Sequence, residues 1–366
     1  MNYGLREESM WKHKAFSTDD FPAILSMAQE QYGLDNDIAN EDFLRYQYFK
    51  NPAGDALIDL AVDVQDGALA GQYVVWPMRF LIHGQLRQSS NSLNTLTGKK
   101  YRGQGIFTGL AEETYRREEE LGHAFCYGMP NPNSYPGFIK KLNFKELGQI
   151  PLLLRPLRPS QMVEEFLHSK VLSVFGKPTD PFFRIKESVK EGALEILPVT
   201  KERLELVDEF WNAVKGKYPV MNIRDGAFVR FRYLDMPRRT YFPYLAVEHG
   251  RPVCFAVGRI MEVAGMQCAM LADFLFADGY AEAAERLLRK LLYEMQNQGA
   301  SLAGCLMFGH TQESAVLKKL GFFRCPKRFE PQPFPLILRL FDQSLEEKGV
   351  CDVKNWFFTM GDYDVI

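Results

Sequence analysis

The sequence has few of the features that mark secreted, membrane or metal-binding proteins. Six cysteines occur in 366 residues, and none is paired as C-x-x-C or spaced with histidine as zinc ligands are. We therefore expect reduced, mostly buried thiols and no metal site. No run approaches 18 apolar residues, and residues 1–8 contain acids without an apolar stretch. Neither a membrane span nor a signal peptide is expected, and the default location is the cytoplasm.

An excess of charge of one sign is also lacking. The net charge is −2, with 46% hydrophobic and 25% charged residues, which is ordinary for a soluble globular protein. Nothing in this balance indicates a nucleic acid or an anionic membrane as partner. The length of 366 residues exceeds one typical domain and favours two.

What is present is a basic, glycine-rich stretch between a strand-like run and a helical pattern. It extends from Thr95 to Leu110, and the helical pattern runs from Ile106 to Glu120. Glycines allow a tight turn, and the free N–H groups and dipole of a helix start favour a bound anion. Lysines and arginine at positions 99, 100 and 102 add positive charge. The stretch therefore indicates a pyrophosphate site.

Two other phosphate motifs fit this stretch less well. A dinucleotide loop requires G-x-G-x-x-G, whereas the third glycine here, Gly109, comes one position too late after Gly103 and Gly105. A nucleotide P-loop requires G-x-x-x-x-G-K-[ST], and the chain contains no such string. An ordinary glycine-rich turn between a strand and a helix is the remaining alternative.

The string Tyr101–Ile106 resembles the acyl-CoA pyrophosphate loop of the GNAT acetyltransferase superfamily, whose core is [QR]-x-x-G-x-[GA]. Arg102 and Gly105 match it, whereas Phe107 stands where the family usually has glycine or alanine. The expected order of elements over residues 1–157 is also similar to that of a GNAT domain. That order is helix, helix, β-meander, glycine loop, helix, strand, helix and strand.

The second half of the chain repeats strings of the first half in the same order. We interpret this as duplication of a unit of roughly 170 residues, far longer than solenoid repeats. The expected fold is α/β (α+β), with two tandem GNAT-like domains, each a mixed, mostly antiparallel sheet flanked by helices. The expected domains are 1–157 and 196–366, joined by a linker at 158–195. The matching strings are Phe43–Tyr48 with Phe228–Tyr233, Ile139–Phe144 with Leu317–Phe322, and Pro151–Arg155 with Pro335–Arg339.

The resemblance implies which residues would bind acetyl-CoA or another acyl-CoA. The backbone before the loop would bind the pantetheine and thioester, and the loop N–H groups would bind the pyrophosphate. Two asparagines after the next strand either bond the pantetheine arm or form a turn and cap a helix. In chain order, these residues are Thr95, Leu96, Thr97, Arg102, Gly103, Gln104, Gly105, Ile106, Phe107, Asn131 and Asn133.

The second copy lacks the loop. After the strand that ends at Phe276, the chain continues as Ala277–Tyr280, with an acid and no basic cluster. We therefore expect one acyl-CoA site per chain, in the N-terminal copy.

The expected acid and base are less well defined. The tyrosine that usually protonates the leaving thiolate in this superfamily is replaced by Ile139, and Tyr135 either substitutes for it or packs in the core. Asn94 stands where an acid often acts as base, so the base would be Asp273, His310 or a water. Asp362 and Asp364 lie in the C-terminal segment, which either places a carboxylate in the cleft or, as is more common for a polar terminus, is exposed to solvent.

The leading hypothesis is an acyl-CoA-dependent N-acyltransferase that acetylates the amine of a small molecule, sugar or peptide. One alternative is an aminoacyl transferase of the peptidoglycan-bridge type, which also duplicates this fold. Another is a non-catalytic acyl-CoA-binding regulatory protein. The sequence leaves the acceptor and the oligomeric state open.

Overall fold

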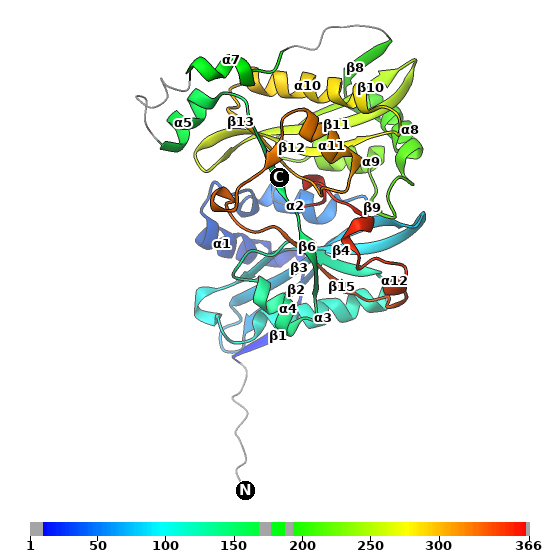
Figure 1. Cartoon of the computed structure of the whole chain (residues 1–366). Coiled ribbons are helices and arrows are strands. Elements are labelled where there is room, and N and C mark those ends of the chain that lie inside the picture. Colours follow the sequence, from blue (N-terminus) through cyan, green and yellow to red (C-terminus); the bar gives the residue numbers. More distant parts are fainter. Residues whose placement is uncertain (1–9, 168–176, 187–192, 364–366) are drawn as a thin grey trace. The chain divides into compact units, whose positions relative to one another are not determined.

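The computed structural model describes residues 10–167, 177–186 and 193–363, and the chain divides into two compact units (Figure 1). Unit 1 contains the described residues up to 79, together with 87–147 and 337–351. Unit 2 contains 80–86, 148–336 and 352–363, apart from the residues outside the described ranges. Three parts of the chain discussed above lie outside the described residues. They are residues 1–8, part of the predicted linker, and Asp364.

Unit 1 is built on a mixed sheet with the strand order β1-β2-β3-β4-β5-β15-β6. Neighbours β1 and β2, β2 and β3, and β5 and β15 are antiparallel, whereas β4 and β5 are parallel. The strands are β1 (Trp11–Ala15), β2 (Leu57–Asp63), β3 (Leu69–Ile82), β4 (Gln85–Thr97), β5 (Phe125–Gly128), β6 (Lys145–Gln149) and β15 (Pro335–Leu340).

The helices of unit 1 begin where the sequence provides caps. Asn40 caps α2 by accepting a hydrogen bond from the Phe43 N–H, and Ser17 and Asp20 form a capping box just before α1. α3 buries one stripe of side chains, including Leu110 and Tyr115, as a helical period requires. The helices are α1 (Phe21–Tyr32), α2 (Glu41–Phe49), α3 (Ile106–Glu120), α4 (Tyr135–Lys141) and α12 (Ser344–Glu347).

Unit 2 contains a second, mostly antiparallel sheet with the order β14-β7-β13-β12-β11-β10-β8. The strands β12 and β13 are parallel, and the end of β3 pairs with β9, which pairs with β16. The strands are β7 (Leu152–Pro156), β8 (Leu194–Pro198), β9 (Val220–Asn222), β10 (Phe242–Glu248), β11 (Arg251–Val263), β12 (Met266–Phe276), β13 (Leu302–Leu306), β14 (Phe323–Arg324) and β16 (Trp356–Phe357).

Helices flank this sheet as well. α10 and α8 both pack on β11, where Gly258 leaves room for Met295 of α10. The predicted fold class, mixed and mostly antiparallel sheets flanked by helices, is thus confirmed. The helices are α5 (Pro159–Leu167), α7 (Asp180–Phe183), α8 (Leu204–Val214), α9 (Gly226–Val229) with a π-helical turn (Arg230–Leu234), α10 (Ala281–Asn297) and α11 (Gln312–Lys319).

The two units exchange one strand each. β7 pairs with β13 in unit 2, although it directly follows the elements of unit 1. Residues Ile337–Leu340 of β15 pair with β5 in unit 1, although they follow the elements of unit 2. The predicted domain 1–157 includes β7, and the predicted domain 196–366 includes β15. The compact units differ from these domains in both strands and in residues 80–86.

The sheets share a feature that positions the site. The parallel pairing of β4 with β5 joins Ser90 to Cys126 and ends at Asn91 and Tyr127, although β4 continues to Thr97. In unit 2, the pairing of β12 with β13 ends at Met270, and β12 likewise continues to Phe276. Beyond these points each strand carries backbone groups that its parallel neighbour does not pair.

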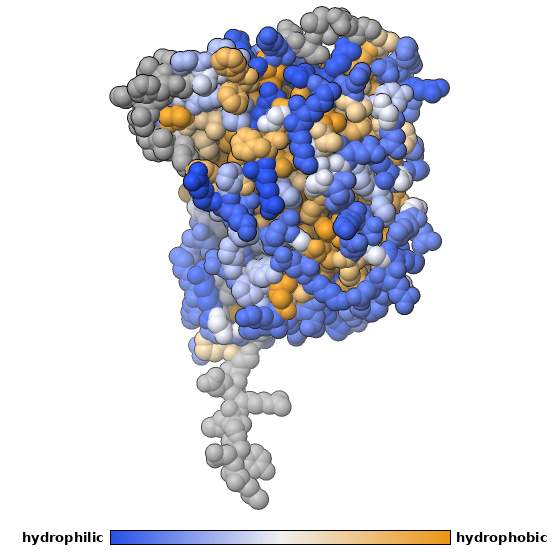
Figure 2. Space-filling model, viewed as in Figure 1, coloured by the Kyte–Doolittle hydropathy of each residue, from blue (hydrophilic) through white to orange (hydrophobic). Residues whose placement is uncertain are grey.

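All six cysteines are free thiols, five of them buried, as the sequence indicated. Within the described ranges, no helix is both long and apolar enough to cross a membrane. Hydrophilic and hydrophobic residues are interspersed on the face shown in Figure 2. The same ranges contain no group of three or more His, Cys, Asp or Glu side chains arranged to hold a metal ion.

Candidate active site

The glycine-rich loop of unit 1 has the backbone that an anion site requires. Gly103 and Gly105 have φ of 82° and 77°, in the left-handed region that glycine adopts without strain. Gly105 is the N-cap residue of α3, and no side chain caps this helix start. The N–H groups at the start of α3 therefore keep their capacity to bind an anion.

A cavity of about 240 Å³ lies against this loop. Six of the predicted cofactor-binding residues line it: Thr97, Arg102, Gly103, Gly105, Ile106 and Phe107. Four lining residues were not predicted: Tyr101, Thr108, Gly137 and Lys141. Leu96, by contrast, packs into a cluster with α1. Gln104 holds the loop in place, because its carbonyl oxygen accepts a hydrogen bond from Trp11 Nε1 at 3.1 Å.

The positive charges at the loop differ in their partners. Lys100 pairs with Asp63 at 3.2 Å, and Lys99 lies 3.7 Å from Glu30. The hydrogen bond to Asp63 is the main cause of the raised pKa of Lys100. Arg102 and Lys141, both exposed, form no ion pair with any described residue. These two cations are thus left for a ligand.

Phe107 departs from the family pattern, and the structure shows where its ring goes. A Cβ built on Gly137 of α4 would lie 2.7 Å from Phe107 Cε1, so the ring fits against the bare glycine. The ring also contacts Phe138 edge-on, with centroids 5.1 Å apart. The glycine at position 137 therefore accommodates the bulky Phe107 ring, so that the ring does not block the anion site at the loop.

The end of β4 is surrounded by neutral polar groups. Asn94 has a φ of 47°, a conformation that asparagine tolerates better than most residues. Its carbonyl oxygen accepts a hydrogen bond from Gln72 Nε2 at 2.7 Å, and its Nδ2 donates to Gln47 Oε1 at 2.7 Å. The Thr97 carbonyl oxygen accepts from Gln31 Nε2 at 3.2 Å. Amide side chains thus fix the strand whose backbone would contact the thioester.

A chain of hydroxyls reaches the point where β4 and β5 separate. The Tyr73 hydroxyl lies 2.7 Å from Ser92 Oγ and also hydrogen-bonds the Tyr115 hydroxyl. Both tyrosines are fully buried, and burial raises the pKa of each well above its ordinary value. Ser92 directly follows the last paired residue, and its Cβ faces Gly128 at the end of β5. The sequence alone did not predict that these three hydroxyl groups lie together.

The residues predicted around α4 are already engaged. The Tyr135 hydroxyl donates to Glu146, and this hydrogen bond raises the pKa of Tyr135. Asn131 Oδ1 accepts hydrogen bonds from the N–H groups of Asn133 and Ser134, at 3.0 and 3.1 Å. Asn131 therefore forms the turn that was one of its two alternatives, and Asn133 is exposed. The roles of Tyr135, Asn131 and Asn133 in catalysis or pantetheine binding stay predictions.

Asp273, the predicted base, lies in the interior of unit 2. It is fully buried, accepts a hydrogen bond from Arg224 Nε at 2.9 Å and another from the Tyr233 hydroxyl at 3.1 Å. These partners favour a structural role, and its role as base stays a prediction. His310, the other side chain considered, lies 2.9 Å through Nε2 from the Trp356 carbonyl oxygen.

The C-terminal segment was expected to be exposed, and this was wrong for its described part. Residues Trp356–Asp362 are buried, and Asp362 accepts a hydrogen bond from Arg224 Nη2 at 2.6 Å. Thr359 Oγ1 donates to Asp273 Oδ1 at 3.1 Å. The buried guanidinium compensates both carboxylates, which sequence position alone does not indicate.

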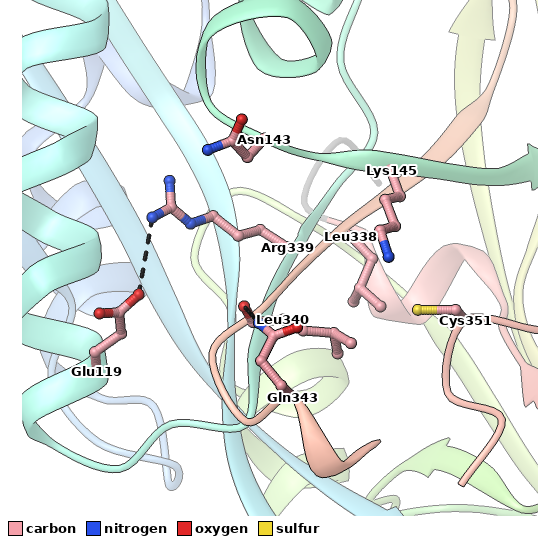
Figure 3. A pocket seen from close by; sticks show the side chains of 8 residues that line it. All are labelled: Glu119, Asn143, Lys145, Leu338, Arg339, Leu340, Gln343 and Cys351. Atoms are coloured by element: carbon pink, nitrogen blue, oxygen red, sulfur yellow. Dashed lines mark hydrogen bonds and ion pairs between the residues drawn. The ribbon is translucent and has the colours of Figure 1, made fainter. Parts of the chain in front are cut away.

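A second cavity of unit 1, of about 280 Å³, does not offer the same chemistry (Figure 3). It is lined by Arg339, Lys145 and Cys351 among others. Arg339 donates to the Leu142 carbonyl oxygen at 3.1 Å and extends toward Glu119, and Lys145 pairs with Glu346. No glycine-rich loop lines it, and both of its cations, Arg339 and Lys145, already have partners within the protein.

Comparison with known proteins agrees with this geometry. The model of the acetyltransferase (GNAT) domain matches residues 13–146. A GCN5-related N-acetyltransferase from Anabaena variabilis has a similar structure, with a TM-score of 0.63 and 11% identity over 91% of this chain and 73% of that chain. N-myristoyltransferase of Saccharomyces cerevisiae with bound myristoyl-CoA has a TM-score of 0.61 and 12% identity over 91% of this chain and 83% of that one.

A probable N-acyltransferase from Enterococcus faecalis has a TM-score of 0.63 and 11% identity over 92% of this chain and 75% of that one. No curated protein matches the sequence. At these identities the structures show the fold, and the domain model shows the family of the residues that it covers. Residues 13–146 therefore form a domain of the acetyltransferase (GNAT) family, in a chain that shares its fold with these three proteins.

Proposed function

We propose that this protein transfers an acyl group, most simply acetyl, from an acyl-CoA to the amine of a small molecule, sugar or peptide. One observation carries the proposal. The uncapped start of α3, the left-handed Gly103 and Gly105, and Arg102 all border one cavity. This is the arrangement that binds a pyrophosphate. The myristoyl-CoA bound to the yeast neighbour supports an acyl-CoA ligand of this fold.

The chemistry follows from the residues around the end of β4. The amine nitrogen attacks the thioester carbonyl carbon, the carbon–sulfur bond breaks with its electron pair on sulfur, and the proton that the amine nitrogen loses passes to water. The backbone at Thr95–Thr97 would hold the pantetheine and thioester. Because β4 and β5 separate after Asn91, this backbone is not paired with β5. Holding the two reactants in register supplies much of the rate even where no strong base is at hand.

We assign to Ser92 the hydrogen bond that stabilises the leaving thiolate. The tyrosine expected at position 139 is absent, and Ile139 packs against the core. If Tyr73 donates to Ser92 Oγ, the proton of Ser92 is directed toward the gap between β4 and β5. The buried hydroxyl of Tyr73 would thus orient Ser92, while Ser92 itself would contact the thioester.

Unit 2 is proposed to support the site without binding a second cofactor. At the position equivalent to the loop, Lys217 Nζ donates to the Phe276 carbonyl oxygen at 2.7 Å and lies 3.7 Å from Asp278. Glu282 is in the first turn of α10. These acids disfavour a pyrophosphate there. The free thiols support a reducing compartment, and we place the reaction in the cytoplasm.

A non-catalytic acyl-CoA-binding role is the second candidate, and Ile139 in place of the usual tyrosine favours it. Release of free thiol from acetyl-CoA, measured with a panel of amines, separates the two functions. An acyltransferase releases thiol only when a suitable amine is present, and a Gly105→Glu variant releases none. Binding of acetyl-CoA without thiol release for any amine would instead establish the binding protein.

A further inference from the structure

We propose that Lys141 binds the 3′-phosphate of the acyl-CoA, so that this protein selects 3′-phosphorylated donors over 3′-dephosphorylated ones. The inference rests on the proposed acyl-CoA site and adds a residue that determines donor specificity. It starts from the cavity at the glycine loop, where Arg102 comes from the loop and Lys141 from α4.

The position of Lys141 along α4 separates it from the start of α3. Gly137 and Lys141 are four residues apart on α4, so they lie on one face of the helix, and both line the cavity. Gly137 marks the contact with α3, because Phe107, the second residue of α3, packs against it. Lys141 lies one helical turn, about 6 Å, farther along α4. A pyrophosphate at the α3 start and an anion at Lys141 would therefore be separate groups.

The charges at the cavity call for a second anion. The N–H groups of α3 and Arg102 suffice for a pyrophosphate, whose charges they face. A phosphate monoester carries a charge near −2 at neutral pH, and a cation that faces it forms charge-assisted hydrogen bonds with it. Lys99 and Lys100 are paired with Glu30 and Asp63, whereas Lys141 has no acidic partner among the described residues. In coenzyme A, the 3′-phosphate is the anion that lies one sugar away from the pyrophosphate.

Calorimetric titration of the full chain with acetyl-CoA and with 3′-dephospho-acetyl-CoA tests this inference. We expect the wild type to bind acetyl-CoA roughly three- to tenfold more tightly, as for an accessible charge-assisted contact. Lys141→Ala should abolish this preference while leaving the affinity for 3′-dephospho-acetyl-CoA unchanged. Lys140→Ala is the matched control, because this neighbouring exposed lysine does not line the cavity, and it should keep the preference.

Each other outcome overturns the inference in a distinct way. If Lys141→Ala weakens both ligands equally, Lys141 contacts the pyrophosphate or acts at long range. If the preference survives in Lys141→Ala, another group binds the 3′-phosphate. If the wild type binds both ligands equally well, the 3′-phosphate is not recognised. If the wild type binds neither ligand, the proposed acyl-CoA function fails as well.

Discussion

At the scale of single residues, the hydroxyl chain where β4 and β5 separate assigns a specific role to Ser92. Tyr73 lies between Ser92 and Tyr115, and both tyrosines are fully buried. The Tyr73 hydroxyl is buried and already hydrogen-bonded to both Ser92 and Tyr115, so Tyr73 is suited to orient Ser92 and not to contact the thiolate itself. Ser92 is half-buried and lies where the thioester would end.

We therefore expect Ser92→Ala to lower kcat by about 10²-fold, the lower end for loss of a hydrogen-bond donor to a developing negative charge. The KM for acetyl-CoA should change little, because the lost contact strengthens only as the thiolate departs. Tyr73→Phe should lower kcat in the same direction but less. Steady-state kinetics with the amine that turns over fastest measure both effects. Tyr115→Phe is the control, because it keeps the bond between Tyr73 and Ser92; an unchanged kcat in Ser92→Ala would refute this role.

Some residue roles were predictable from the sequence and others were not. The roles of Gly103 and Gly105 were predictable, because a tight turn before a helix needs the left-handed conformation that they show. Asn143 also takes this conformation, with a φ of 56°, which asparagine tolerates better than most residues. Ser92 and Lys141 were not predictable, because their roles depend on neighbours that are distant in the sequence.

At the scale of elements, the contact between α3 and α4 shapes the cavity wall. Phe107 of α3 and Gly137 of α4 fit together because Gly137 has no side chain. A methyl group at position 137 would gain about 1 kcal/mol in helix propensity. It would also overpack the contact, which costs about 1–3 kcal/mol and displaces α4 from the loop.

We expect Gly137→Ala to lower the free energy of unfolding and to weaken acetyl-CoA binding. Urea denaturation and calorimetric titration measure the two effects. In a Phe107→Ala background there is room for the methyl group, so Gly137→Ala should no longer destabilise the protein. A cost that is equal in both backgrounds would show that the two side chains do not interact.

Most elements of unit 1 were predictable because each has a local signal. The caps at Ser17 and Asn40 and the period of buried side chains predicted α1, α2 and α3. The edge strand β1 was missed, since its five residues carry little apolar pattern. Its formation depends on antiparallel pairing with β2 and on His13, which lies 2.8 Å from the buried Asp59.

At the scale of the whole molecule, the repeated strings predicted two similar sheets, but they did not predict that β7 and β15 belong to the unit other than the expected one. The apolar runs of β7 and β15 are near-copies, so either run fits either sheet by pattern alone. The burial of Trp356–Asp362 was also not predicted from the sequence. The apolar side chains of Trp356, Phe357 and Phe358 are consistent with burial, but the pairing of Asp362 with Arg224 could not be read from the sequence.

The central claim is that each chain binds one acyl-CoA, at the loop from Arg102 to Phe107 in unit 1. Calorimetric titration with acetyl-CoA tests it on the wild type, on Gly105→Glu and on Gly67→Glu. The control Gly67 has a φ of 74° in the β2–β3 hairpin, close to the 77° of Gly105, so both variants carry similar backbone strain. The account predicts one site per chain in the wild type and in Gly67→Glu, and none in Gly105→Glu, where a carboxylate would repel the pyrophosphate. Two sites per chain, or binding that survives in Gly105→Glu, would contradict it.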